Sequence, residues 1–355
     1  MSYYRLVLAF LFSGISIVSC QSDTEYFLNG GYSYVDDRVE TCRIQGTEVP
    51  GSDGYDAIRI AICDTLGFFY SWKYPDGFVA VLHVETGEEF GVYCPKGRGP
   101  LETTGMSPIH DLRYERGMLR AEILDVHRQR LLVWNITESL DKGRTIYDTV
   151  SPMTTKTIYQ WCSKIDNERY FTCSAAIPFE DIREVVAPKY AVVSLMDGRK
   201  EREYQLFRDS ILAVTSLGKW LMPDFVAMEY DMKPDRSKVV MGMAHYPQIN
   251  ILDLDSGELH GYRYKALHSV TTARRIWYYA SVCCDDEHVY ALYNAVDLSD
   301  FQSNTQSSVV HVFDWNGDLT QKLDLNGCFD QIYLDNGYIY ALNRRKGVVR
   351  YELSS

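Results

Sequence analysis

The sequence lacks the short motifs that mark most metal and enzyme sites. It has no Cys-x-x-Cys pair, and its eight histidines show neither the His-x-His nor the His-Glu-x-x-His spacing of a zinc site. It also lacks the Gly-x-Ser-x-Gly turn of many hydrolases and the Gly-Lys-Ser/Thr ending of a phosphate-binding loop. The sequence therefore predicts no metal ligand, no cofactor and no catalytic residue, and it leaves the question of catalysis open.

Positive charge is scarce as well. The 355 residues include 36 Lys and Arg against 48 Asp and Glu, which gives a formal net charge of −12. A nucleic-acid-binding surface needs an excess of cations, so this balance argues against DNA or RNA as a partner. We expect an acidic exterior and a monomeric protein.

No hydrophobic run is long enough to cross a membrane. The longest, Leu6–Val18, has about 13 residues and falls short of the ~20 that a spanning helix requires. It follows Arg5 and ends at Ile17-Val18-Ser19-Cys20, which resembles a bacterial lipobox. We predict a signal peptide at 1–19, cut before Cys20, whose thiol then carries a diacylglycerol. An ordinary signal peptide with a cysteine near its end is the alternative.

A lipid at Cys20 would hold the rest of the chain at a membrane. Residues 20–38 are polar, with Gly30-Gly31 and Asp36-Asp37, and predict a flexible tether to a folded domain. Each buried methylene of an acyl chain contributes ~0.8 kcal/mol, so two or three chains anchor a protein without any spanning helix. We expect an exported lipoprotein at the outer membrane or the cell surface.

One sequence pattern occurs five times after residue 80: a hydrophobic strand, a tight polar turn and a second strand. The turns lie near residues 87, 137, 198, 257 and 317, at spacings of 50, 61, 59 and 60 residues. A strand repeat with this period is typical of a β-propeller, in which each repeat forms one four-stranded blade. A second internal similarity relates Ile123–Trp134 to Ala341–Tyr351, where Asp125 and Asn343 are expected to cap equivalent turns. The predicted fold class is all-β, a six-bladed β-propeller.

The predicted blades cover residues 55–97, 106–148, 156–207, 211–265, 273–326 and 329–353, within a single domain at 39–355. The sixth blade is one strand short when the chain ends. We expect the N-terminal strand at 39–48 to pair with this blade, which closes the ring and removes exposed strand edges. Five or seven blades remain open, and only short stretches such as 179–186 are expected to form helical turns.

Three polar stretches of the predicted propeller have structural explanations. Gly97-Arg98-Gly99-Pro100 has the glycines and the cation of an anion-binding nest, but we interpret it as a tight crossover between blades. Asp253, Asp255 and Glu258 are spaced like the start of a calcium loop, yet the alternating leucines indicate a strand and its hairpin. The run Asp285-Asp286-Glu287 predicts a solvated turn.

Arg274 and Arg275 are the candidate binding residues. They precede the strand Ile276–Ala280, and they would lie at a mouth of the central channel if that strand is the innermost of its blade. A basic pair on the outer surface is the alternative.

Eight cysteines remain after Cys20. Export permits disulfides, although a chain of this size does not depend on them. Cys162 and Cys173 flank a predicted turn at Asp166-Asn167, so they are expected on adjacent strands and are the best candidates for a disulfide.

Several stretches resemble the TolB-like six-bladed propeller lipoproteins of Bacteroidetes. The most specific is Gly91–Glu102, with Gly97, Gly99, Pro100 and Glu102 in the positions of a Gly-x-x-Gly-x-Gly-Pro-x-Glu stretch between the first two blades. The closing blades are similar around Val289–Tyr293, Val312–Gly317 and Ile339–Ala341. The resemblance implies the fold and a surface location, for which the acidic residues after Cys20 resemble an export signal. It implies no common reaction.

Two hypotheses for the function follow. The first is a lipid-anchored binding or scaffolding module of the cell envelope, which holds an envelope protein or a glycan with loops at one end of the channel. The second is a cell-surface enzyme acting on polysaccharide. Carboxylates with perturbed pKa values that converge at one mouth of the channel would favour the enzyme.

Overall fold

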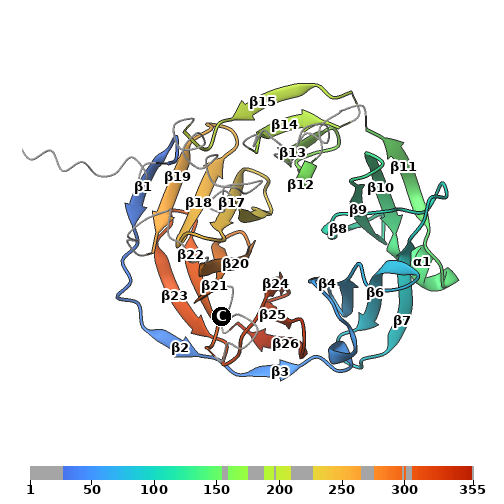
Figure 1. Cartoon of the computed structure of the whole chain (residues 1–355), viewed down its shortest axis with the longest axis horizontal. Helices are drawn as coiled ribbons and strands as arrows, with labels where there is room; N and C mark the ends of the chain where they lie inside the picture. Colours follow the sequence, from blue (N-terminus) through green and yellow to red (C-terminus); the bar gives the residue numbers. More distant parts are fainter. Residues whose placement is uncertain are drawn as a thin grey trace, which may run out of the picture.

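The computed structural model describes residues 27–153, 159–174, 188–195, 197–208, 227–264, 276–297, 300 and 306–353. In these residues, six sheets stand around a central axis, and the predicted six-bladed β-propeller is confirmed (Figure 1). Where both ends are described, the observed blades begin and end within a few residues of the predicted limits. The predicted limits at 156, 211, 265 and 273 lie outside the described residues.

Blades 1, 2 and 3 are four-stranded antiparallel sheets. From the channel outward, the strands are β4 (Arg59–Cys63), β5 (Leu66–Tyr70), β6 (Gly77–His83) and β7 (Glu89–Pro95) in blade 1; β8 (His110–Glu115), β9 (Met118–Asp125), β10 (Arg130–Asn135) and β11 (Tyr147–Pro152) in blade 2; and β12 (Tyr159–Lys164), β13 (Arg169–Ser174), β14 (Tyr190–Ser194) and β15 (Lys200–Tyr204) in blade 3.

Blades 4, 5 and 6 each include one strand from the N-terminal part of the chain. From the channel outward, the strands are β16 (Met228–Met232), β17 (Lys238–Met243), β18 (Gln248–Asp253), β19 (Leu259–Arg263) and β1 (Gly31–Tyr34) in blade 4; β20 (Ile276–Cys284), β21 (His288–Asp297), β22 (Val309–Asp314), β23 (Leu319–Asp324) and β2 (Thr41–Arg43) in blade 5; and β24 (Gln331–Asp335), β25 (Tyr338–Asn343), β26 (Gly347–Glu352) and β3 (Gly46–Glu48) in blade 6.

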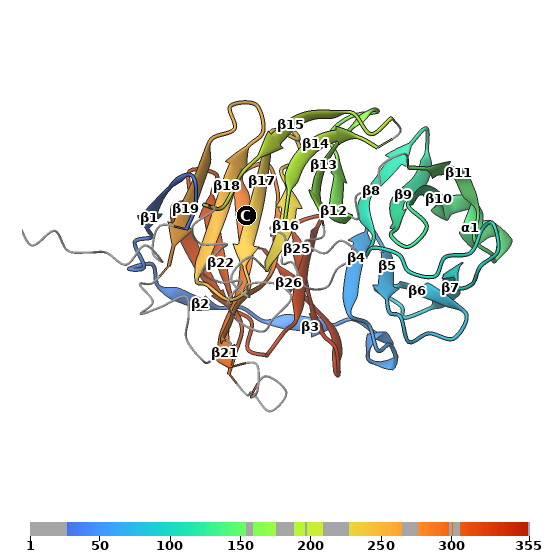
Figure 2. The ribbon, with the colours of Figure 1, turned by 45° about the horizontal axis from the view of Figure 1, so that its top comes forward.

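Residues 27–48, which we call the N-terminal strap, run along the outside of blades 4, 5 and 6 (Figures 1 and 2). β1 pairs in parallel with β19, β2 in parallel with β23, and β3 antiparallel with β26. The chain thus closes the ring as predicted, since β3 is the outer strand of blade 6. A short 3-10 helix, η2 (Ser52–Gly54), follows the strap and leads to β4.

The predicted single strand at 39–48 is divided between two blades. β2 extends blade 5, where the Ile44 amide still donates to the Asp324 carbonyl at 3.1 Å. The chain then crosses to blade 6 at Gly46, where a Cβ atom would lie 2.4 Å from Val349 Cγ1 and 2.6 Å from Tyr351 Cε1. Because only glycine fits so close to these side chains, the crossing occurs there and β3 alone completes blade 6.

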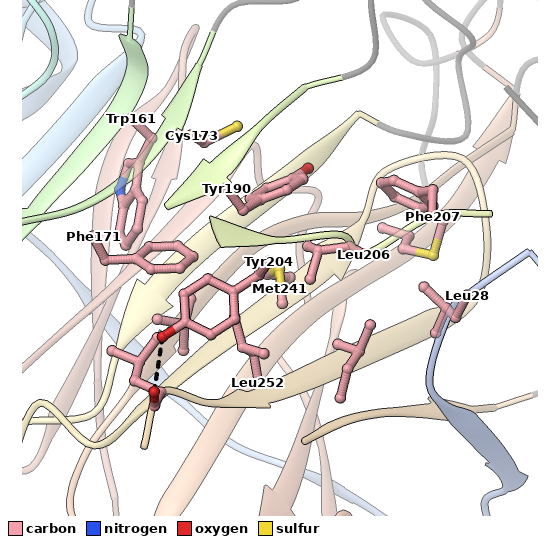
Figure 3. Packing of buried hydrophobic residues seen from close by; sticks show 14 of the residues in the cluster. Leu28, Trp161, Phe171, Cys173, Tyr190, Tyr204, Leu206, Phe207, Met241 and Leu252 are labelled. Atoms are coloured by element: carbon pink, nitrogen blue, oxygen red, sulfur yellow. Dashed lines mark hydrogen bonds between the residues drawn. The ribbon is translucent and has the colours of Figure 1, made fainter. Parts of the chain in front are cut away.

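The strap begins inside the segment 20–38 that the sequence predicts as a tether. Phe27 and Leu28 are buried, and Leu28 forms a bridge with Phe207, which follows blade 3 (Figure 3). The Arg208 amide donates to the Phe27 carbonyl and the Asn29 amide to the Leu206 carbonyl, both at 2.9 Å. Two apolar residues therefore fix the chain to the ring from Phe27 onward.

The aromatic residues pack between neighbouring blades. Figure 3 shows one such cluster, which joins blades 3 and 4 and includes Trp161, Phe171, Tyr190, Tyr204, Met241 and Leu252. The hydroxyl of Tyr204 donates to the Leu254 carbonyl at 2.8 Å, so its polar end is satisfied within the core. Packing on pleated sheets explains the tyrosine content of these blades.

One predicted turn is a helix. The sequence predicts a tight turn near residue 137, but α1 (Ile136–Lys142) connects β10 to β11. The Asn135 side chain accepts a hydrogen bond from the Glu138 amide at 3.0 Å, and Gly143 ends the helix at φ 60°. An Asn followed three residues later by Glu is a helix-start pattern, which the strand repeat obscured. The stretch 179–186 lies outside the described residues.

The two faces of the ring carry connections of different length. Hairpins between first and second strands are short, as from Cys63 to Leu66 and from Asp335 to Tyr338; we call their side the turn face. The other side, the loop face, carries longer connections between blades, such as those from Pro95 to His110 and from Asp324 to Gln331. Across the described ranges, none of the helices has the length and hydrophobicity to cross a membrane.

Candidate functional site

The central channel contains a network of paired charges. The Arg113 guanidinium on β8 binds Asp111, Glu115 and Glu122 at 2.8, 2.6 and 2.6 Å. Lys164, on the innermost strand of blade 3, also binds Glu122, at 2.8 Å. Asp111 and Glu122 are nearly buried, and these cations compensate their charges.

Two further ion pairs join blades that are not neighbours. Arg236 of blade 4 binds Asp111 of blade 2 at 2.6 Å, and Arg59 of blade 1 binds Glu229 of blade 4, on the opposite side of the ring, at 2.7 Å. Asp111 holds a left-handed backbone conformation at φ 58°, where the register of β8 shifts. Side chains therefore cross the channel, and its charges neutralise one another.

Two carboxyl groups on the turn face have raised pKa values. Burial raises the pKa of Asp231 to about 6, although the Met232 and Cys284 amides donate to its oxygens at 2.8 and 2.9 Å. Burial, together with the nearby Asp64 carboxylate, raises the pKa of Asp335 to about 6. Backbone amides already bind both groups: those of Met232 and Cys284 bind Asp231, and that of Asp64 binds Asp335.

A cavity on the loop face lies between blades 5 and 6. Its volume is ≈ 790 Å³, within the range that holds small ligands and peptide segments. Three parts of the chain line it: the strap at 44–48, the connection between the blades at 325–330, and the hairpin at 343–347 between β25 and β26. We call this cavity the loop-face groove.

Hydrogen bonds fix the walls of the loop-face groove. The Asp330 carboxylate accepts from the Arg344 amide at 2.9 Å, and its pKa is raised by burial. The Asn343 side chain donates to the Cys328 carbonyl at 2.7 Å and accepts from the Arg345 and Lys346 amides. Because a side chain of each wall binds the backbone of the other, the groove is formed before any ligand binds.

Three consecutive cations stand at the rim of this groove. Arg344, Arg345 and Lys346 are exposed, and Glu48 of the strap is the exposed anion among the lining residues. Phe329 and Tyr351 line it as well, but they are only 4% and 2% exposed. The groove therefore presents a cationic rim to solvent in a chain that is acidic overall.

This site was not predicted from the sequence. The basic residues at 344–346 belong to the similarity between Ile123–Trp134 and Ala341–Tyr351, and no ligand is predicted for them there. The available signal was three cations in succession in an acidic chain, beside the shortened last blade. The candidate residues predicted from the sequence, Cys20, Arg274 and Arg275, lie outside the described residues. The two arginines were predicted at a channel mouth on the condition that the strand after them is the innermost of its blade, and β20 holds that position.

The glycine-rich stretch forms the connection between blades 1 and 2. The Gly99 amide donates to Glu102 Oε2 at 2.7 Å, while the guanidinium groups of Arg128 and Arg130 bind carbonyl oxygens of residues 98–102. The cations thus hold carbonyl groups of this loop, as expected for a crossover. Asp253 accepts from the Asp255 and Ser256 amides of its own hairpin. Over the described ranges, no group of His, Cys, Asp and Glu side chains is placed to hold a metal ion.

The predicted disulfide between Cys162 and Cys173 is wrong. Both residues lie on adjacent strands, but Cys162 pairs with Thr172 and Cys173 with Trp161, so the two are offset by one residue. Since successive side chains of a strand point to opposite faces, the two thiols enter different cores. All eight cysteines at 42–328 are free thiols.

Comparison with known proteins supports the fold. No family model and no curated protein matches the sequence. In structure, the chain is similar to a protein named as an exported protein of Bacteroides fragilis, with 10% identity and a TM-score of 0.51, over 91% of this chain and 99% of that one. It is also similar to a member of the DUF4221 family from Bacteroides vulgatus, with 11% identity and a TM-score of 0.49, over 89% and 93% of the two chains. At such identities the likeness shows the fold alone.

Proposed function

We propose that this protein is a lipid-anchored binding module of the bacterial cell envelope, and that the loop-face groove is its ligand site. The observation that carries the proposal is a preformed cavity of ≈ 790 Å³ with a rim of three exposed cations. Surface cavities of this size on rigid scaffolds are common binding sites. The charged side chains of the channel already bind one another, so the groove is a better candidate for a ligand site than the channel.

The location at the envelope rests on the N-terminal sequence and on one structural neighbour. The lipobox-like end at Cys20 and the likeness to an exported Bacteroides protein both support export. Cys20 precedes Phe27, which is buried in the ring, by only a few residues, and an extended residue spans at most ~3.6 Å. A lipid at Cys20 would therefore keep blades 3 and 4 close to the membrane. Membership of the TolB-like lipoproteins is part of the proposal.

Two measurements test the anchor and the binding. Wild type and Cys20→Ala are expressed in a bacterium fed with radiolabelled palmitate, and only the wild type is expected to be labelled and membrane-bound. The anchored protein is then recovered from its native membrane beside the double variant Arg345→Glu/Lys346→Glu. We expect an envelope component that the variant loses. Labelling of Cys20→Ala would contradict lipid attachment at Cys20. Recovery of the same envelope components with the wild type and the double variant would contradict the groove as the ligand site.

A polysaccharide-cleaving enzyme is the second candidate, favoured by the raised pKa values of Asp231 and Asp335. Release of reducing ends from envelope polysaccharide by the wild type, abolished in Asp335→Asn, would support it. We expect no such release, because both carboxylates are already held by backbone amides.

A further inference from the structure

The hairpin that lines the loop-face groove has a counterpart in blade 2. Asp125 begins the hairpin between β9 and β10, and its Oδ1 accepts from the Arg128 amide at 3.3 Å. Asn343 begins the hairpin between β25 and β26, and its Oδ1 accepts from the Lys346 amide at 3.0 Å. Arg128 and Lys346 are each three residues after the capping residue, so they occupy corresponding places on the loop face.

In blade 2, the cations of this hairpin bind a loop of peptide. Arg128 Nη1 donates to the Gly99 and Glu102 carbonyl oxygens at 2.6 and 3.1 Å. Arg130 donates to the Pro100 and Glu102 carbonyl oxygens at 2.7 and 2.8 Å. The hairpin thus binds the carbonyl oxygens of the chain segment that leads into blade 2.

Blade 6 has the corresponding hairpin, between β25 and β26, but no loop that corresponds to residues 98–102. In both blades a residue shortly before the first strand makes the same contact: the Ser107 amide donates to Leu124 O and the Asp330 amide to Leu342 O, each at 2.8 Å. The connection into blade 2 runs from Pro95 to His110, whereas that into blade 6 runs only from Asp324 to Gln331. The shorter connection has no part that corresponds to residues 98–102, and the groove opens beside the hairpin.

The lining favours a peptide over a sugar. The aromatic residues among the lining, Phe329 and Tyr351, are almost completely buried, so a sugar ring would find no exposed aromatic face on them. The rim offers instead the cations of Arg345 and Lys346, whose donors suit carboxylate and carbonyl oxygens.

We propose that the loop-face groove binds an acidic peptide segment of a partner protein, which Arg345 and Lys346 hold by carboxylate and carbonyl oxygens. This inference rests on the proposed binding function and specifies its ligand. The protein has a net charge of −12, so an acidic peptide is attracted only where cations gather locally. Binding should therefore weaken as salt screens these contacts.

The test is fluorescence anisotropy with the whole protein and a pool of labelled octapeptides. In this pool, Glu is fixed at alternate positions and the remaining positions are randomised. A matched pool carries Gln in place of Glu, and labelled dextran sulfate serves as the anionic glycan probe. We expect binding of the Glu pool, little binding of the Gln pool, and a loss of about tenfold or more in affinity for Arg345→Glu/Lys346→Glu.

The control variant is Arg199→Glu/Lys200→Glu, which reverses two exposed cations of the hairpin between β14 and β15 on the turn face. It should bind the Glu pool like the wild type, and both variants should keep the wild-type melting temperature. Equal losses in the two variants, or no binding of the Glu pool, would overturn the proposal. If dextran sulfate alone binds and depends on Arg345 and Lys346, the peptide ligand is excluded while the proposed binding function stands.

Discussion

Arg59 and Glu229 form an ion pair of 2.7 Å across the channel, although 170 residues separate them in the sequence. Arg59 lies on the innermost strand of blade 1 and Glu229 on that of blade 4, so the pair joins opposite sides of the ring. Burial raises the pKa of Glu229, and the Arg59 guanidinium opposes that effect. The pair therefore depends on the correct closure of all six blades.

Arg59→Met should destabilise the protein, because it leaves the Glu229 carboxylate partly buried without its cation. Both side chains keep some contact with solvent, so we expect a loss of about 1–3 kcal/mol in the free energy of unfolding measured with urea. The control is Lys142→Met, which breaks an exposed pair with Glu138 on α1 and should cost under about 1 kcal/mol. Equal effects of the two variants would show that the cross-channel pair adds nothing specific.

Asp335 should make stability fall as pH rises. Its pKa is 3.8 in an ordinary environment and about 6 in the folded protein, so between these values the folded state binds more protons than the unfolded chain. The contribution of this group therefore decreases from about pH 4 to pH 6 and stays low above that. Asp335→Asn removes the charge while its Oδ1 can still accept from the Asp64 amide.

We expect Asp335→Asn to match the wild type near pH 4 and to exceed its stability near pH 7 by on the order of 1 kcal/mol, after a discount for partial exposure. Urea unfolding at a series of pH values measures this. Asp286→Asn, at an exposed turn position, serves as the control and should follow the wild-type curve. Parallel curves for the wild type and Asp335→Asn would refute the assignment.

Gly46→Ala should weaken the closure of the ring. The added methyl group would meet Val349 and Tyr351 well inside van der Waals distance, and β3 must shift away from β26 to admit it. Overpacking of this kind costs about 1–3 kcal/mol, which thermal or urea unfolding detects. At Gly54, by contrast, a Cβ meets nothing within 4 Å, so Gly54→Ala should be nearly neutral. A neutral Gly46→Ala would mean that β3 is not held against β26.

The thiols should be free and mostly unreactive. Burial raises the pKa of the Cys63 and Cys94 thiols to about 12, so at pH 8 they are protonated and poor nucleophiles. Cys42 on the strap is exposed and should react first with iodoacetamide, while the others react after unfolding in urea. Mass spectrometry of the alkylated protein measures both steps. A disulfide-linked peptide from protein handled without reductant would contradict the free state.

The sequence predicted the blades because each is a local pattern. Alternating strands, short turns and a period near sixty residues recur along the chain, and a blade forms largely from consecutive residues, so its limits could be placed to within a few positions. The repeat misled at residues 136–142, where a helix replaces the expected turn. The hairpin predicted around Asp166-Asn167 placed Cys162 and Cys173 on adjacent strands, but one residue of register keeps the two thiols apart.

The tertiary structure alone decided where the strap divides and which charges meet. The sequence predicts a tether followed by one strand for the strap, whereas the structure divides it into β1, β2 and β3 on the outer edges of blades 4, 5 and 6. The pair of Arg59 and Glu229 and the groove between blades 5 and 6 exist only once the ring has closed. A strand pattern fixes which residues face each side of one sheet, whereas contacts across the ring depend on the packing of all six sheets.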